Sequence, residues 1–339
     1  MAPRPILPSG HRIEVVDCFR ALAIAPVIAF HYSLTYVPAA PGRPTLFAPN
    51  DGPASLGWLG VELFFMISGF VIFMTLHNCR SIKEFALRRA LRLYPPLILC
   101  ALITFTLAPR IDPGWPPISL GSVFASLLLI PPLGHTLWVD QAYWSLQVEA
   151  VFYVWIGVLF FTARDRFLIA WLALMTVSTA VTAAWPASPA VLALGSPYLP
   201  FFSFGMAGYL RFSQGRLTRT AAILLAASAL SYVILWRSRS PGVHLAIAAM
   251  VLLFEAFLRG WLGWLAVQPL TWLGRISYPL YLLHDVIGLS LLAGLGLARI
   301  LSLAVAVLVV TGLATAVHQW LERPLHHAAK GWVQRLVPG

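Results

Sequence analysis

Arg20 and His31 are two polar residues within one long apolar stretch, RALAIAPVIAFH. A guanidinium group binds phosphate oxygens through paired N–H donors, and an imidazole exchanges protons near neutral pH. In a continuous helix, residues eleven positions apart differ in direction by about 20° and in height by about 16 Å. The spacing therefore predicts an anion-binding group and a proton acceptor on one helix face at different depths, provided that the helix continues through Pro26.

Other polar residues also interrupt apolar runs. Ser145, Glu149 and Tyr153 recur every four residues in WSLQVEAVFY, so they share a helix face. Arg89 and Arg92 share a face at a spacing of three. An ionisable side chain inside a membrane costs roughly 2.5–3.5 kcal/mol on insertion scales and usually serves a function. The remaining residues of this kind are Asp17, Glu62, His77, Arg88, Glu255, Arg275, His284 and Asp285.

Most of these residues also have a purely structural interpretation. Arg89 and Arg92 could anchor a helix end at the cytoplasmic surface. Arg20 could pair with Asp17, which lies three positions before it. Either membrane histidine could simply hydrogen-bond to a neighbouring helix. A structural role is harder to argue for Glu149, because it lies deep in an apolar run.

Composition indicates a membrane protein. Of the 339 residues, 59% are hydrophobic and 10% charged, and the mean hydropathy is +0.81, whereas soluble domains carry about 25% charge. The net charge of +11 indicates membrane topology and not nucleic-acid binding, because no basic cluster alternates with aromatics in a soluble segment. Cys18, Cys79 and Cys100 lie within or beside apolar runs, which predicts small core residues and neither disulfides nor zinc ligands.

The apolar runs predict an all-α, polytopic transmembrane bundle, because a membrane-spanning helix needs about 20 apolar residues. A shorter run at 122–133 ends in two prolines and could cross, re-enter or lie at the interface. We expect one integral-membrane domain over 1–339, without a soluble C-terminal domain. The ten long runs are 15–37, 57–77, 88–108, 144–163, 166–185, 190–211, 218–236, 243–258, 276–296 and 300–321.

The placement of the basic residues favours ten crossings with both termini in the cytoplasm. If 122–133 does not cross, 17 of the 23 Lys and Arg residues face the cytoplasm and five face outside, while Arg20 lies within the membrane. If that run crosses, every later loop changes side and the bias disappears. The basic residues that remain outside in the favoured topology are Arg43, Arg110, Arg237, Arg239 and Arg299.

This topology predicts two polar clusters at different depths. The inner cluster consists of arginines and suits a phosphate-bearing ligand that arrives from the cytosol. The outer cluster, His31 with Glu149 and Glu62, suits proton transfer, because a carboxylate can fix the tautomer of a histidine. The inner cluster contains Arg20, Arg89, Arg92 and Arg275.

Six stretches, spread in order over nearly the whole chain, resemble motifs of the membrane-bound acyltransferase-3 family, which O-acylates sugars and other acceptors. The first contains an arginine, ten residues and a histidine, and the third contains an Arg-x-x-Arg motif. Some members of the family carry an additional esterase-like domain, which we do not expect here. The six stretches are RIEVVDCFRALAIAPVIAFH, LGVELFFMISGFVIF, FALRRALRLYPP, WSLQVEAVFY, LGRISYPLYLLHD and LERPL.

The resemblance implies a cytosolic acyl-CoA donor, usually acetyl-CoA, and His31 as the essential base. It also implies a hydroxyl acceptor that often lies at the extracytoplasmic face, and it makes the arginines donor ligands. We expect no metal, no nucleic-acid partner, and a carbohydrate or lipid-linked carbohydrate acceptor at the bacterial inner membrane, with lipid around the protein. The donor-binding set is Arg20, Arg89, Arg92, Arg275, Tyr281 and His284, and the supporting set is Asp17, Glu62, Ser68, Ser145 and Tyr153.

The predicted mechanism is direct transfer. His31 removes the proton from the acceptor hydroxyl, Glu149 orients or charges His31, and the alkoxide attacks the thioester. An acyl-enzyme relay through Ser68 or Ser145 is the alternative, although neither serine lies in a nucleophile-elbow motif.

Other functions stay open at this point. The acceptor could be a small secreted metabolite or a lipo-oligosaccharide. A proton-coupled transporter or flippase of a polysaccharide intermediate would also use membrane carboxylates and histidines. However, no internal repeat of the kind that many transporters contain is evident. A passive scaffold in a polysaccharide-export complex is the third class.

Overall fold

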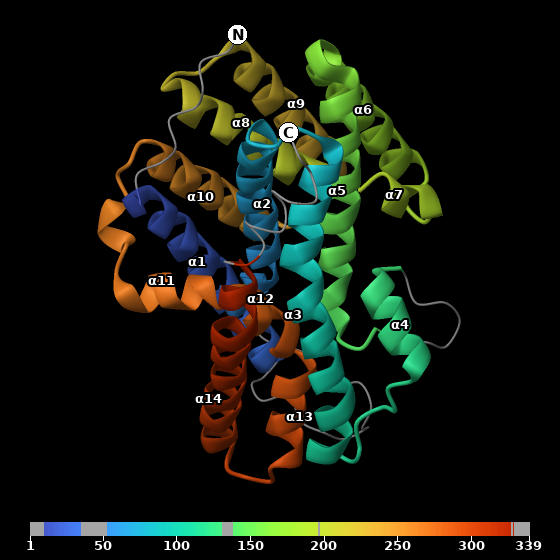
Figure 1. The fold of residues 1–339 in the computed structure, drawn as a ribbon, viewed down its shortest axis with the longest axis vertical. Helices are drawn as coiled ribbons and strands as arrows, with labels where there is room; N and C mark the ends of the chain where they lie inside the picture. The colour runs from blue at the N-terminus through green and yellow to red at the C-terminus, as the bar shows by residue number, and fades with distance from the viewer. Residues whose placement is uncertain (1–9, 35–52, 131–137, 196, 327, 329–339) are drawn as a thin grey trace. The chain divides into compact units, whose positions relative to one another are not determined.

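A computed structural model describes residues 10–34, 53–130, 138–195, 197–326 and 328. Every regular element within these ranges is a helix or a helical turn, and they contain no strand (Figure 1), which confirms the all-α prediction. The long helices are α1 (Gly10–Leu34), α2 (Gly60–His77), α3 (Ile82–Ile111), α5 (Trp144–Ala163), α6 (Phe167–Ala184), α8 (Leu199–Gln214), α9 (Arg219–Trp236), α10 (Pro241–Leu258) and α14 (Arg299–Val317). The shorter ones are α4 (Leu120–Leu128), α7 (Pro189–Ala193), α11 (Gln268–Arg275), α12 (Ser277–Leu283) and α13 (Val286–Gly294), with 3-10 turns at Pro53–Leu59, Gln141–Tyr143, Arg164–Arg166 and Gly263–Leu265 and a π-helical turn, η5, at His318–Glu322.

The protein is a multi-pass membrane protein. Among the described residues, seven segments are long and apolar enough to cross a membrane. One of them, 141–184, contains two predicted runs, joined by the 3-10 turn at Arg164–Arg166. The predicted runs 190–211 and 276–296 form shorter helices, so the count of ten crossings stays a prediction. The seven segments are 14–32, 55–77, 82–111, 141–184, 219–236, 241–258 and 300–326.

The structure bears on two local predictions, the continuity of the first helix through Pro26 and the short run at 122–133. Helix α1 is continuous and contains Pro26, as the common face of Arg20 and His31 requires. Helix α4 has nine residues, about 14 Å of rise, which is too short to cross a hydrocarbon core of about 30 Å. Residues 131–133, the end of the predicted short run, lie outside the described ranges, as do residues 35–37 and both termini.

The chain forms two compact units, and the first consists of residues 1–20, 61–86 and 148–271. Helices α2 and α8 approach closely here because both carry glycine at the contact. A methyl group on Gly69 would lie 2.0 Å from the carbonyl oxygen of Phe202, and one on Gly205 would lie 2.0 Å from that of Met66. Helix α9 packs against α6 and α8.

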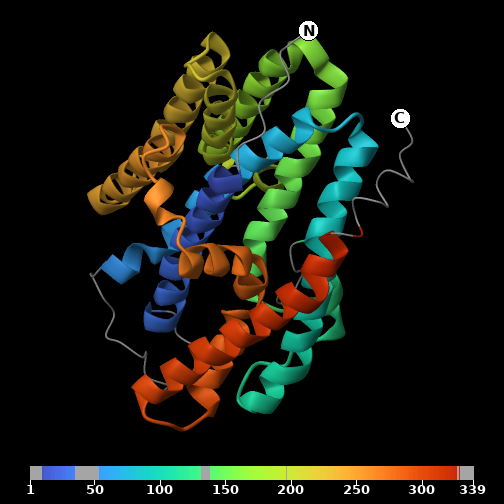
Figure 2. The same ribbon diagram turned by 60° about the vertical axis from the view of Figure 1, so that its left-hand side comes forward.

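The second unit consists of residues 21–60, 87–147 and 272–339. Helix α14 packs along α12 and α13, and Figures 1 and 2 show α14 beside α13. Gly288 of α13 accommodates Tyr32 of α1, because a methyl group there would lie 2.0 Å from the tyrosine hydroxyl. The second unit therefore brings the end of α1 against the segment where α12 gives way to α13.

Candidate active site

Two histidines meet in the second unit. His31 lies in the last turn of α1, and His284 follows α12 directly. His31 Nδ1 is 3.0 Å from His284 Nε2, and the ring centroids are 4.8 Å apart. His284 is fully buried, whereas His31 is partly accessible. The pair therefore has one imidazole fixed in the protein interior and one whose surface is partly accessible.

The surrounding carbonyl groups fix the tautomers of both rings. His284 Nδ1 lies 2.8 Å from the carbonyl oxygen of Tyr281, which can only accept, so this nitrogen carries a proton. In the neutral ring, His284 Nε2 is then a bare acceptor, and His31 Nδ1–H donates to it. The carbonyl oxygen of Val27 lies 3.0 Å from His31 Nδ1 and accepts from the same N–H. Consequently, Nε2 of neutral His31 holds the free lone pair of a general base.

Hydroxyl groups hold the backbone around His284. Tyr32 donates to the carbonyl oxygen of His284 at 3.0 Å, and Tyr143 donates to that of Leu282 at 3.3 Å. The hydroxyls of Ser145 and Tyr281, both sequence-predicted site residues, lie 2.8 Å apart, and both reach the carbonyl oxygen of one residue, Ala142. This network fixes the position of His284 relative to the start of α5.

The predicted run 276–296 is interrupted at His284 and Asp285, between α12 and α13. Asp140 satisfies backbone groups at this interruption, because its carboxylate accepts from the N–H of Val286 at 3.1 Å and from that of Ala142 at 2.9 Å. Burial and the neighbouring Asp285 raise the pKa of Asp140 well above its usual range. Asp285 is itself buried and directly follows His284.

Several predicted site residues belong to the first unit. Glu149 accepts a hydrogen bond from Ser68, which makes a serine–carboxylate pair. Arg20 donates to Asp17 at 3.2 Å, as the structural interpretation of their spacing anticipated. Glu62 is 1% exposed, and its Oε2 has no hydrogen-bond partner among the described residues. The pairing of His31 with Glu149 and the donor role of Arg20 stay predictions.

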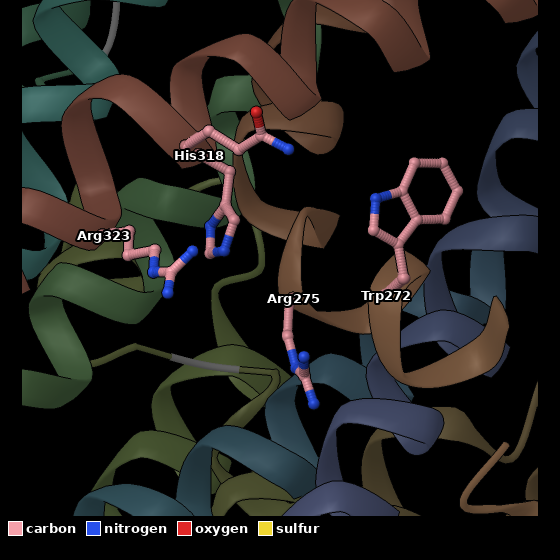
Figure 3. A pocket seen from close by; sticks show the side chains of 5 residues that line it. Trp272, Arg275, His318 and Arg323 are labelled. Atoms are coloured by element: carbon pink, nitrogen blue, oxygen red, sulfur yellow. The ribbon is translucent and has the colours of Figure 1, made fainter. Parts of the chain in front are cut away.

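The remaining predicted residues lie on three helices. The ring of Tyr153 on α5 packs edge-on against Phe85, with centroids 6.4 Å apart. On α3, the Nε atom of Arg89 is buried, whereas Arg92 is exposed. Arg275 ends α11 and lines a cavity of about 410 Å³, drawn in Figure 3. The other residues that line this cavity are Trp272, His318, Gln319 and Arg323.

Sequence reasoning missed several residues of the site. Asp140 lies outside every long apolar run, so its sequence context does not mark it as a residue of the site. Tyr32 is adjacent to His31 and has no separate signal in the sequence, and the sequence indicates no specific role for Asp285. Within the described ranges, no group of three or more His, Cys, Asp or Glu side chains is arranged to hold a metal ion.

Comparison with known proteins assigns the chain to a family. The sequence profile of an acyltransferase domain matches residues 13–319. The chain is also similar to a protein of Shigella phage Sf6 named O-acetyl transferase, at 26% identity over 166 residues. That alignment covers 44% of this chain and 46% of the phage protein, so it spans less than half of the relative's length. No solved structure matches. The extent of the profile match shows that this chain belongs to the acyltransferase-3 family.

Proposed function

We propose that this membrane acyltransferase moves an acyl group, most simply acetyl, from cytosolic acyl-CoA to a hydroxyl of a carbohydrate. The acceptor would be an exopolysaccharide, a lipopolysaccharide or a lipid-linked sugar at the bacterial inner membrane. The observation that carries the proposal is the His31–His284 pair, whose hydrogen bonds leave His31 Nε2 as the proton acceptor. The printed name of the phage relative, O-acetyl transferase, supports acetyl as the group and oxygen as the acceptor atom.

The proposed reaction needs one base that later acts as an acid. His31 Nε2 takes the proton of the acceptor hydroxyl as its oxygen attacks the thioester carbonyl carbon. The new C–O bond forms, the C–S bond breaks, and the imidazolium returns the proton to the departing thiolate. His284 keeps Nδ1–H of His31 engaged throughout. In this scheme His284 orients the base, the role that an aspartate plays in serine hydrolases.

The Ser68–Glu149 pair supports one alternative route, in which Ser68 first takes the acyl group. Incubation of the purified protein with labelled acetyl-CoA, without acceptor, separates the two routes. Direct transfer predicts that no label remains on the denatured protein. A labelled Ser68 peptide would instead favour the relay, in which acyl-CoA is still the donor.

A second candidate function, a flippase of a lipid-linked sugar, draws support from the interruption between α12 and α13, since discontinuous helices are common in transporters. A test of both functions uses the purified protein in lipid vesicles, with isotope-labelled acetyl-CoA outside and lipid-linked sugars in the membrane. The acyltransferase predicts a sugar heavier by one labelled acetyl group. Movement of unmodified, unlabelled sugar across the membrane would refute the acyltransferase function and support the flippase.

A further inference from the structure

The cavity of about 410 Å³ in the second unit is lined by two separate elements. Trp272 and Arg275 come from α11, whereas His318, Gln319 and Arg323 come from η5 and the residue after it. Figure 3 draws these side chains, with His318 and Arg323 at the left of the view and Arg275 and Trp272 at the centre and right. The volume falls within the range of about 300–1,000 Å³ that is typical of small-molecule sites.

The π-helical turn η5 explains why His318 and Arg323 line the same cavity. The N–H of Arg323 donates to the carbonyl oxygen of His318, five residues earlier. In an α-helix, residues five apart point about 140° away from each other. The wider π turn aligns them, and such turns occur frequently at functional sites. His318 is further held by Glu322, at 2.7 Å between Nδ1 and Oε2.

The lining combines two guanidinium groups with an indole ring. Guanidinium groups bind phosphate oxygens through paired N–H donors. An indole face offers a stacking surface for a nucleobase, and Trp272 is 40% exposed. The predicted topology assigns Arg275 and Arg323 to the cytoplasmic side, where acyl-CoA is available.

We propose that this cavity binds the nucleotide end of the acyl-CoA donor, with phosphate on Arg275 and Arg323 and adenine against Trp272. This inference rests on the proposed function and adds Trp272, His318 and Arg323 to the donor site. The phosphate of an anionic lipid headgroup shares part of this chemistry, but it provides no base to stack on the indole.

The test measures binding of adenosine 3′,5′-bisphosphate to the full chain in nanodiscs of neutral lipid. Arg323→Gln and Arg275→Gln should each weaken binding at least tenfold, because each removes charge-assisted hydrogen bonds to a phosphate group. Arg216→Gln, at an exposed arginine in another loop, is the matched control and should bind normally. Trp272→Leu should weaken binding of the bisphosphate but leave binding of pyrophosphate unchanged.

Steady-state kinetics distinguish the loss of a donor contact from misfolding of the variant. Arg323→Gln should raise KM for acetyl-CoA with kcat unchanged, and Arg323→Lys should restore part of the affinity. Unchanged bisphosphate binding in both glutamine variants, with acetyl transfer intact, would refute the nucleotide site but not the proposed function. Displacement of the bisphosphate by anionic lipid, with no effect of Trp272→Leu, would assign the cavity to a headgroup. Absence of any acetyl transfer in the wild type would instead refute the proposed function.

Discussion

At the scale of single residues, the proposed chemistry depends on the histidine pair. The resemblance to the acyltransferase-3 family implied that His31 is the base, and the face that it shares with Arg20 followed from elementary helix geometry. His284 was also singled out, but as a donor ligand. Its contact with His31 joins residues 253 positions apart, which no local pattern could indicate. The tautomers of both rings depend on two backbone carbonyl groups, whose positions a sequence does not show.

Replacement of His284 tests the orienting role. His284→Leu removes the acceptor for His31 Nδ1–H, so we expect kcat to fall by roughly 10²–10⁴-fold with KM for acetyl-CoA unchanged. His284→Gln can keep an oxygen near the position of Nε2 and should retain more activity. Steady-state kinetics with purified variants provide the measurement. If KM rises while kcat stays constant, His284 is a donor ligand, as the sequence alone suggested.

At the scale of elements, hydropathy located the helices but not their irregularities. Helices lie at all ten predicted runs, because apolar residues must be buried in lipid or protein. The interruption at His284 and Asp285 was not predictable, since SYPLYLLHDVIGLSLL is almost continuously apolar. The π turn at His318–Glu322 was not predictable either, because it depends on a shift of backbone hydrogen bonds and not on residue type.

Asp140 should stabilise the interruption between α12 and α13. Asp140→Ala leaves the buried N–H groups of Ala142 and Val286 without their acceptor, at about 1–3 kcal/mol each. We expect a lower melting temperature in detergent and a large loss of activity. Asp140→Asn keeps one carbonyl oxygen and should be the milder change. Equal stability of wild type and the alanine variant would contradict the capping role.

The close packing of α2 against α8 gives a second test at this scale. Gly69→Ala would place a methyl group 2.0 Å from a carbonyl oxygen of α8, so the helices must separate, at a cost of about 1–3 kcal/mol or more. The matched control is Gly312→Ala, because no atom lies within 4 Å of the added methyl group. That change should stabilise α14 by up to about 1 kcal/mol. Thermal unfolding that ranks the two variants in the opposite order would refute the packing.

At the scale of the whole molecule, composition alone established a helical membrane protein, whereas the division into two units was not predictable. The units are assembled from three separate stretches each, and helices α1, α2, α3, α5 and α11 contribute residues to both. Such a division arises from long-range packing, for which sequence periodicity carries no signal.

The topology prediction can be tested at Gly215. This glycine follows α8 with a φ of +66°, and a methyl group added to it would meet no atom within 4 Å, so a fused reporter should be tolerated there. Ten crossings predict a cytoplasmic reporter at 215 and an extracytoplasmic one at 240, after Arg237 and Arg239. Phosphatase and fluorescent-protein fusions provide the readout. An extracytoplasmic reporter at 215 would show that the segment 122–133 crosses.

The rate of acetyl transfer by His31→Ala tests the central claim most directly. The variant, the wild type and His244→Ala are purified in nanodiscs and assayed with labelled acetyl-CoA and a lipid-linked sugar. His244 is a suitable control because it is also hydrogen-bonded, to Tyr232 in the first unit. We expect transfer by His31→Ala to fall by roughly 10²–10⁴-fold, while His244→Ala keeps the wild-type rate. A folded His31→Ala variant that transfers acetyl groups at the wild-type rate would contradict the account.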